Sequence, residues 1–377
     1  MNIVENRRLI QVVPRLLPGR CGISDHAVTL ASELKTSYGI SAAFVVLNSD
    51  ERSDLPYPTL RCAPDQLLNA CVALSGSSSA AMLVHLSGYG YAANGAPTLL
   101  ADALEQVRAD SRFPIAVFFH ELFAGGMPWT SAFWYAWRQK KAYRRIAEVC
   151  DLAVTNAHVF ADWLEREMAL SSVRQSISLS ASAVQCLPVF SLAGEPEHLA
   201  GIAQRDRVMA VFGLAGTRQR AYRELPGLGD LLDQLGIQKI LDIGPECEAP
   251  CQVNGIPLKR MGVLAATEID RLLSQIAFGY LAYPPNCLAK SGVFAAYSAH
   301  GVIPVIARDF QKEFDGLRDG VHLLSPQTAR TKSPAGLEKC SRAVWRWYRG
   351  HRLHDHAAIY DRWLGAADEA GQRGENE

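Results

Sequence analysis

The chain has 377 residues, of which 49% are hydrophobic and 20% are charged, and 38 basic residues balance 38 acidic ones. This length is long for one hydrophobic core and suits two α/β domains of about 150 to 200 residues each. The charge balance lacks the basic excess of proteins that bind nucleic acid, so we expect no nucleic-acid partner.

The nine cysteines stand singly, in an odd number and without a CxxC pair. This usage predicts reduced thiols in a cytoplasmic protein and gives no sign of a zinc site. The apolar run near the amino terminus ends at Pro14, which is too short for a signal peptide or a membrane span. We therefore expect a cytoplasmic protein in which any membrane contact is peripheral, at the inner face.

Strand-like and helix-like segments alternate through the first half of the chain. Apolar runs predict strands at residues 9–13, 42–47, 81–86, 115–119 and 152–155. The stretches HAVTLASELKTSYG, TLLADALEQVRAD and AHVFADWLEREMA have helical periodicity. Such alternation favours a parallel sheet covered on both faces.

A second series follows a looser region of turn-forming residues, where we expect the linker near residues 190–205. Strands are predicted at 208–213, 239–243, 278–282 and 303–306, with a helix at 267–276. The pattern predicts an N-terminal Rossmann-like domain over residues 1–195 and a second one over 205–340. A helix at 341–365 follows, and residues 366–377 form a polar tail that we expect to be disordered.

Ligands of open parallel sheets bind beyond the carboxyl ends of the strands, where loops lead into the N-termini of helices. The first such loop here is PRLLPGRCGISD. Gly19 and Gly22 would let the backbone approach a ligand, and Asp25 would cap the following helix. The turn is neither GxGxxG nor a P-loop, so a purely structural turn remains an equal alternative.

The second loop, VFFHELFAGGMPW, places His120 and Glu121 directly after a predicted strand. A histidine there is placed to donate to a ligand or to transfer a proton, although a lone histidine is often structural. His85 lies near the end of another predicted strand, and lining the site and packing are equal alternatives for it.

Two further loops carry basic residues. In VFGLAGTRQRAYR, a strand leads through Gly213 to Arg218 and Arg220, whose guanidinium groups match phosphate oxygens. In YPPNCLAKSGVFAAYSAHGVIPVI, a helix is predicted to start between residues 289 and 292, beside Lys290. A solvated basic turn and an ordinary helix start are the respective alternatives.

The stretch PWTSAFWYAWRQKKAYRR, within residues 128–145, combines aromatic and basic residues. A helix with aromatic residues against its own domain and a solvated basic face is the commoner outcome. Peripheral contact of residues 129–145 with an anionic membrane surface is the alternative.

Taken in order, these segments resemble the retaining bacterial glycosyltransferases of family four, also called group 1. The resemblance spans nearly the whole chain, from PRLLPGRCGISDHAVTLASEL through FFHELFAGGMPWTSAFW to GPECEAP, MGVLAATEIDRLL and YPPNCLAKSGVFAAYSAHGVIPVI. It implies the GT-B fold, in which two Rossmann-like domains face each other across a cleft. The first would receive the acceptor, the second would hold a nucleotide diphosphate sugar, and a C-terminal helix would cross back to the first.

By resemblance, the Gly22 loop approaches the donor phosphate, His120 contacts the transferred sugar as the catalytic residue, and Arg218 and Arg220 bind the diphosphate. The other implied donor contacts come from the start of the helix in the last motif, at Lys290, Ser291, Gly292 and Val293. Candidates for lining the site are His85, Glu121, Gly213 and Gly262. The family usually carries two glutamates with seven residues between them, and Leu288 and Ala296 stand in their places.

The implied activity is transfer of a sugar from a UDP-, GDP- or ADP-sugar to an acceptor hydroxyl, with retention and without a required metal or other cofactor. The acceptor would be a saccharide, a lipid-linked molecule or a small molecule. Two alternatives stay open: a sugar-nucleotide epimerase or phosphorylase of the same fold, and a non-catalytic pseudo-transferase that binds sugar nucleotides.

Overall fold

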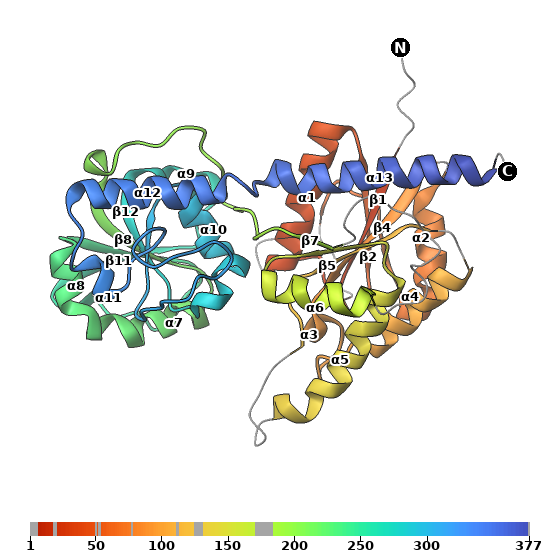
Figure 1. Cartoon of the computed structure of the whole chain (residues 1–377), viewed down its shortest axis with the longest axis horizontal. Coiled ribbons are helices and arrows are strands. Elements are labelled where there is room, and N and C mark those ends of the chain that lie inside the picture. Colours follow the sequence, from red (N-terminus) through yellow and green to blue (C-terminus); the bar gives the residue numbers. More distant parts are fainter. Residues whose placement is uncertain are drawn as a thin grey trace, which may run out of the picture. The chain divides into compact units, whose positions relative to one another are not determined.

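The computed structural model describes residues 7–17, 21–49, 51, 54–76, 78–110, 113–123, 131–169 and 184–375, without the side chains of 131–134 and 370–375. The chain forms two compact units (Figure 1). Unit 1 comprises Met1–Leu187 together with Leu353–Glu377, and unit 2 comprises Pro188–Arg352. The predicted pair of α/β domains is confirmed.

Unit 1 contains a seven-stranded sheet in the order β3-β2-β1-β4-β5-β6-β7, and every neighbouring pair is parallel. Its strands are β1 (Arg8–Val13), β2 (Ser41–Val46), β3 (Thr59–Arg61), β4 (Ala80–Leu86), β5 (Ile115–Phe119), β6 (Leu152–Thr155) and β7 (Val184–Cys186). Five of them were predicted, to within a residue or two. The short β3 and β7 lie at the two edges of the sheet and were missed.

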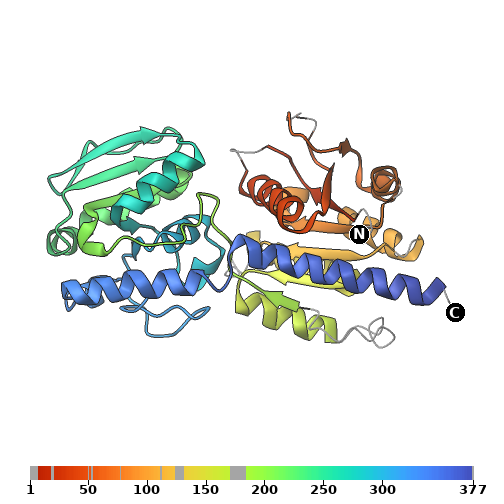
Figure 2. The ribbon, with the colours of Figure 1, turned by 90° about the horizontal axis from the view of Figure 1, so that it is seen from above.

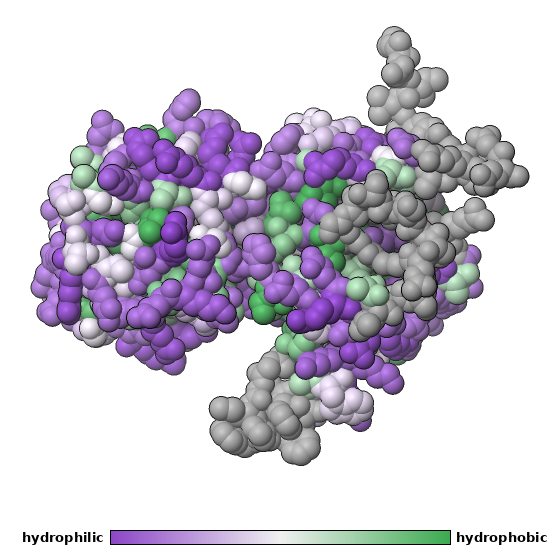
Figure 3. Space-filling view, viewed as in Figure 1, coloured by the Kyte–Doolittle hydropathy of each residue, from purple (hydrophilic) through white to green (hydrophobic). Residues whose placement is uncertain are grey.

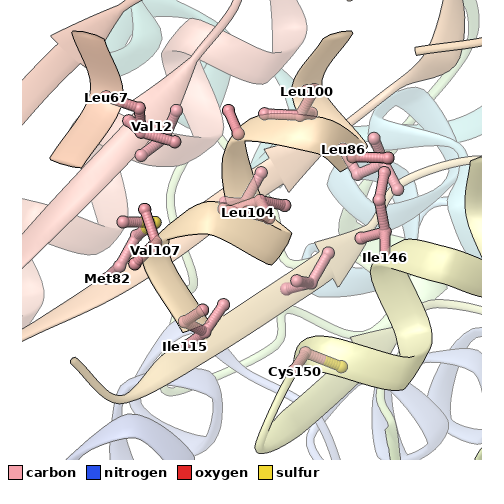
Figure 4. Packing of buried hydrophobic residues seen from close by; sticks show 14 of the residues in the cluster. Val12, Leu67, Met82, Leu86, Leu100, Leu104, Val107, Ile115, Ile146 and Cys150 are labelled. Atoms are coloured by element: carbon pink, nitrogen blue, oxygen red, sulfur yellow. The ribbon is translucent and has the colours of Figure 1, made fainter. Parts of the chain in front are cut away.

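Helices connect these strands, as parallel neighbours require. They are α1 (Gly22–Tyr38), α2 (Leu67–Ser75), α3 (Gly88–Tyr91), α4 (Thr98–Asp110), α5 (Ser131–Val149) and α6 (His158–Ala169), with a 3₁₀ turn η1 (Pro64–Gln66). Apolar side chains of α2 and α4 pack on β1, β4 and β5 in one core cluster, in which Leu104 and Val107 of α4 lie against the sheet (Figure 4).

The last helix of the chain, α13 (Leu353–Glu375), belongs to unit 1 and packs against α1 (Figure 1). His356, Ala357 and Tyr360 on α13 are fully buried. Arg7 forms an ion pair with Asp361 at 2.7 Å, so the amino-terminal part of unit 1 is also tied to this helix. Figure 2 shows α13 along the same unit from a second side.

Unit 2 contains a six-stranded sheet in the order β10-β11-β9-β8-β12-β13, parallel except for the β10–β11 pair. The strands are β8 (Asp206–Phe212), β9 (Lys239–Ile243), β10 (Gln252–Val253), β11 (Ile256–Gly262), β12 (Ile276–Tyr280) and β13 (Ile303–Val305). The four predicted strands are confirmed to within two residues, and β10 and β11 were missed.

The helices of unit 2 cover both faces of this sheet. They are α7 (Ala215–Glu224), α8 (Gly229–Gln234), α9 (Ala266–Gln275), α10 (Gly292–Ala299), α11 (Pro326–Ala329) and α12 (Pro334–Tyr348). Three 3₁₀ turns join them: η3 (Ile202–Gln204), η4 (Leu225–Leu228) and η5 (Pro285–Lys290). Apolar clusters lie on the two sides of the sheet, and the face of unit 2 seen in Figure 3 is mainly hydrophilic.

The boundary between the units differs from the linker expected at residues 190–205. Residues after Leu187 already pack on unit 2: Val189 N donates to Ala289 O at 2.9 Å, and Ser191 N donates to Tyr348 Oη at 2.6 Å. Phe190 is fully buried. The apolar side chains in this loosely patterned stretch explain why it belongs to unit 2.

The single helix expected at residues 341–365 is two helices, α12 in unit 2 and α13 in unit 1. The expected disorder of residues 366–377 is also wrong over most of that range, because α13 continues to Glu375. Within the described part of the chain, no helix is long and apolar enough to cross a membrane. All nine cysteines are free.

Candidate functional site

The carboxyl edge of the unit 2 sheet has a topological switch point between β8 and β12. From β8 the chain continues to β9 on one side, and from β12 it continues to β13 on the other. Ligands of open α/β sheets bind at such a point. The two loops that leave it are the turn at Gly213, before α7, and residues 281–291, before α10.

Three glycines with positive φ follow neighbouring strands at this edge. Their φ angles are +126° at Gly213 after β8, +142° at Gly244 after β9 and +69° at Gly262, the last residue of β11. Gly213 N donates to Ile243 O at 3.1 Å, and Gly244 N donates to Gly262 O at 2.8 Å. A Cβ on Gly244 would collide with the Gly213 carbonyl oxygen. The turn at Gly244 therefore brings backbone close to backbone, which only glycine permits, while Gly213 and Gly262 are favoured by their positive φ.

The N-terminus of α10 lies beside the Gly213 turn. A Cβ added to Gly213 would stand 3.1 Å from Val293 Cγ2, in the first turn of α10. Ser291 is the N-cap, and its hydroxyl oxygen accepts from Phe294 N at 3.2 Å. Gly292 is exposed, so the first backbone amides of the helix are open to a ligand. The predicted start of this helix is confirmed.

Arg218, predicted to bind phosphate, is fully buried instead. Its Nη1 pairs with Asp242 Oδ1 at 2.5 Å, and its Nε donates to Gly213 O at 2.9 Å. Tyr222 also donates to Asp242, and burial together with this bond raises the pKa of Tyr222. The guanidinium therefore holds the Gly213 turn from beneath. The side chain of Arg220 is exposed and that of Lys290 half-buried, so these two remain the basic candidates.

Leu288 and Ala296, which stand where the resemblance implied two glutamates, are buried in the apolar cluster around α10. Neither position presents a polar side chain. At Ala296 the side chain is a methyl group buried inside unit 2.

In unit 1, His85 of β4 and His120 after β5 come together with His26 of α1. His85 Nδ1 lies 3.1 Å from His120 Nε2, and His85 Nε2 lies 2.7 Å from Gln11 Oε1. The His26 ring meets those of His85 and His120 edge to face, with centroids 5.5 and 5.0 Å apart. We call His26, His85 and His120 the histidine group.

Burial keeps the histidine group neutral. It lowers the pKa of His85 to about 3. Burial, followed by the neighbouring His85 and His356, lowers the pKa of His120 well below its usual value. The pKa of His26 is also lowered well below its usual value, mainly by burial and to a smaller extent by His120, His85 and His356. His26 and His85 are buried and His120 is half-buried, so His120 is the member that reaches the surface.

The histidine group is also the set that could hold a metal ion among the described residues, because one nitrogen from each ring lies within 4.8 Å of the others. The 3.1 Å separation of His85 and His120 equally fits a direct N–H···N hydrogen bond. Sequence patterns placed His85 and His120 at neighbouring strand ends but missed His26 and Gln11, which share no motif with them.

The remaining predicted positions lie apart from these contacts. Gly22 is the exposed first residue of α1, so the helix begins before Asp25 and that residue is not its cap. Glu121 is exposed. Gly19 lies outside the described residues, as does the start of the 129–145 segment. In the rest of that segment, Tyr135 and Trp137 on α5 are exposed.

No family model matches the chain, and no curated protein sequence matches it. Solved structures do. The UDP-forming alpha,alpha-trehalose-phosphate synthase from Burkholderia xenovorans is similar with a TM-score of 0.56 and 13% identity, covering 96% of this chain and 98% of that one. The structure named trehalose-6-phosphate from E. coli bound with UDP-2-fluoro glucose has a TM-score of 0.56 and 9% identity, and the match covers 95% of this chain and 98% of that one. A putative UDP-N-acetylglucosamine 2-epimerase from Listeria monocytogenes has a TM-score of 0.54 and 10% identity, and the match covers 98% of this chain and 97% of that one.

At these identities the likeness shows the fold alone. The chain has the GT-B fold, with two Rossmann-like sheets and a C-terminal helix that contacts α1. The expected fold class is confirmed.

Proposed function

We propose that this chain is a glycosyltransferase that moves a sugar from a nucleotide diphosphate sugar to an acceptor hydroxyl, with retention and without a required metal. The observation that carries the proposal is the open N-terminus of α10 at the switch point of the unit 2 sheet. It supplies backbone amides and a positive dipole end beside a glycine turn, an arrangement that suits a diphosphate. The GT-B neighbours include proteins named for UDP and UDP-sugars.

In this proposal the diphosphate is bound by the first amides of α10, by Lys290 and by Arg220. These groups stabilise the negative charge that grows on the leaving diphosphate as the bond to the sugar breaks. Each charged hydrogen bond contributes about 1.5 to 3 kcal/mol. The buried Arg218 takes no part in contacting phosphate and instead fixes the turn that faces it.

His120 is proposed to contact the transferred sugar. Its ring stays neutral at physiological pH because burial and two neighbouring histidines lower its pKa. A neutral imidazole suits a sugar hydroxyl better than it suits a phosphate. The acceptor is proposed to bind to unit 1, and a lipid-linked acceptor would fit the exposed Tyr135 and Trp137 on α5.

The binding test uses calorimetry of the full chain with UDP, GDP, ADP and their glucose conjugates. Lys290→Ala and Arg220→Ala are each expected to weaken the best ligand by about 10- to 100-fold, the equivalent of one charged contact. Arg223→Ala is the matched control, because Arg223 is an exposed arginine on the same helix as Arg220. Unchanged binding by both variants would contradict the site.

A sugar-nucleotide epimerase is the second candidate, because a GT-B neighbour is named as a putative UDP-N-acetylglucosamine 2-epimerase. Incubation with the donor and no acceptor separates the two activities. An isomerised donor would identify an epimerase, whereas an intact donor that is consumed only when acceptor is added would identify a transferase.

A non-catalytic sugar-nucleotide binder is the third candidate. It is favoured by the apolar Leu288 and Ala296 in place of two acidic side chains. Tight binding without turnover across a panel of acceptors would identify it.

A further inference from the structure

A chain of hydrogen bonds crosses three neighbouring strands of the unit 1 sheet and ends at His120. Gln11 lies on β1, His85 on β4 and His120 directly after β5, and these strands are adjacent in the order β1-β4-β5. The contacts are 2.7 Å from Gln11 to His85 and 3.1 Å from His85 to His120. Gln11 and His85 are fully buried, so water does not compete for these bonds.

The position of each proton follows from the first acceptor. The Gln11 amide faces His85 with its oxygen, while its nitrogen is buried without a hydrogen-bond partner. In this orientation the oxygen can only accept, so His85 Nε2 carries the proton that it donates. In a neutral ring the other nitrogen is then an acceptor, so His85 Nδ1 receives the bond from His120 Nε2–H. By the same rule, His120 Nδ1 keeps its lone pair.

The His120 ring is also fixed in orientation. It lies edge to edge with the His85 ring, with centroids 5.4 Å apart and an angle of 26° between the ring planes, and it lies against Phe118 at a centroid distance of 4.3 Å. Its backbone N donates to Leu86 O at 3.0 Å, and its carbonyl accepts from Asn156 Nδ2 at 3.0 Å. Among the residues that the structure describes, none is hydrogen-bonded to His120 Nδ1.

We propose that Gln11 and His85 are positioning residues that hold His120 as its Nε2–H tautomer, so that Nδ1 accepts a hydrogen bond from a hydroxyl of the ligand. That the ligand is a sugar rests on the proposed function; the tautomer does not. The arrangement selects groups that carry O–H or N–H, and it disfavours phosphate or carboxylate oxygens, which have no proton to donate. It therefore assigns His120 to a sugar hydroxyl and not to the diphosphate.

The first test is long-range ¹H–¹⁵N spectroscopy of the full chain labelled at histidine nitrogen, with His120→Gln identifying the signals. We expect His120 to show a protonated Nε2 and an unprotonated Nδ1. His158→Gln, which changes an exposed histidine on α6, is the control that should leave these signals in place. A proton on His120 Nδ1 in the unaltered chain would overturn the proposal.

Two near-isosteric variants then test the two positioning residues. Gln11→Met and His85→Phe each remove one bond of the chain, so the His120 signals should move toward a mixture of tautomers. Thermal melting shows whether each variant folds, and if one of the two does not fold, the other still tests the proposal. An unchanged His120 spectrum in a folded variant would overturn the proposal.

Addition of one equivalent of zinc tests the competing explanation of the histidine group, in which the same nitrogens bind a metal ion. Stoichiometric loss of the His85 and His120 signals would overturn the hydrogen-bonded arrangement, and unchanged signals would support it.

With a donor identified, Gln11→Met should lower kcat at least tenfold for the sugar nucleotide while leaving the affinity for the free nucleoside diphosphate unchanged. Absence of any nucleotide binding would refute the proposed function alone, because the tautomer is read without a ligand.

Discussion

Replacing Arg218 by methionine removes the charge of a buried ion pair while keeping an unbranched apolar side chain. The Arg218 side chain is 0% exposed and that of Asp242 is 5% exposed, so the carboxylate would lose its cationic partner without gaining water. Loss of one member of a buried pair costs about 3 to 5 kcal/mol. Tyr222 still donates to Asp242, so we expect the lower end of that range.

Urea unfolding followed by circular dichroism measures this loss, and calorimetry on the same variant measures nucleotide binding. The double variant Arg218→Met/Asp242→Leu should recover most of the stability, because replacing a whole buried pair by apolar side chains is often close to neutral. Arg223→Met, an exposed change on the same helix, should stay within about 0.5 kcal/mol of the unaltered chain.

The reasoning is refuted by either of two results. One is a loss of stability below about 1 kcal/mol for Arg218→Met, which would mean that the pair is not buried in solution. The other is full stability with abolished nucleotide binding, which would return Arg218 to the phosphate-binding role that its place in the sequence suggests.

Three further outcomes follow from the same geometry. Gly244→Ala should cost more than about 1 kcal/mol and more than Gly255→Ala, since both have positive φ but only the first meets backbone; equal thermal shifts would contradict this. A Cβ at Gly292 would meet no other atom, so Gly292→Ala should leave the thermal stability unchanged. The added methyl group would stand at the proposed diphosphate site, so calorimetry should show weaker diphosphate binding, and equal affinity would count against the α10 site. The histidine group has lowered pKa values, so the unfolded chain binds more protons below pH 6.5; stability should fall as pH drops from there toward about 3, by up to about 1.4 kcal/mol per pH unit for each ring. Urea midpoints at several pH values measure this slope, and His85→Gln should make it shallower.

Strands whose residues are nearly all buried could be predicted from the sequence. Residues 152–155 and 239–243 coincide with β6 and β9, because a short apolar run between turn formers has few other interpretations. The strand β11 was missed because only its first residue, Ile256, is buried, and basic residues stand in its middle. Its identity comes from pairing with β9, which the sequence does not display.

The surroundings of the candidate site residues were predicted less well than the strands, as the burial of Arg218 shows. Placing it by its position after a strand ignored the helical spacing that aligns it with Ala221 and Tyr222 on the buried face of α7. The lone acid in KILDI was a usable signal, because Asp242 in a buried strand requires a partner. No comparable signal linked Gln11 to His85, since their contact depends on strand order.

Unit 1 is built from both ends of the chain, and this has a consequence for synthesis at the ribosome. The strands of its sheet emerge first, yet α13 begins only at Leu353, after the whole of unit 2. Until then, Glu33 and Tyr38 of α1, which contact His354, have no helix beside them. We expect the nascent unit to stay incompletely closed and exposed to chaperones for the time that unit 2 takes to emerge, so completion of unit 1 waits for the synthesis of α13.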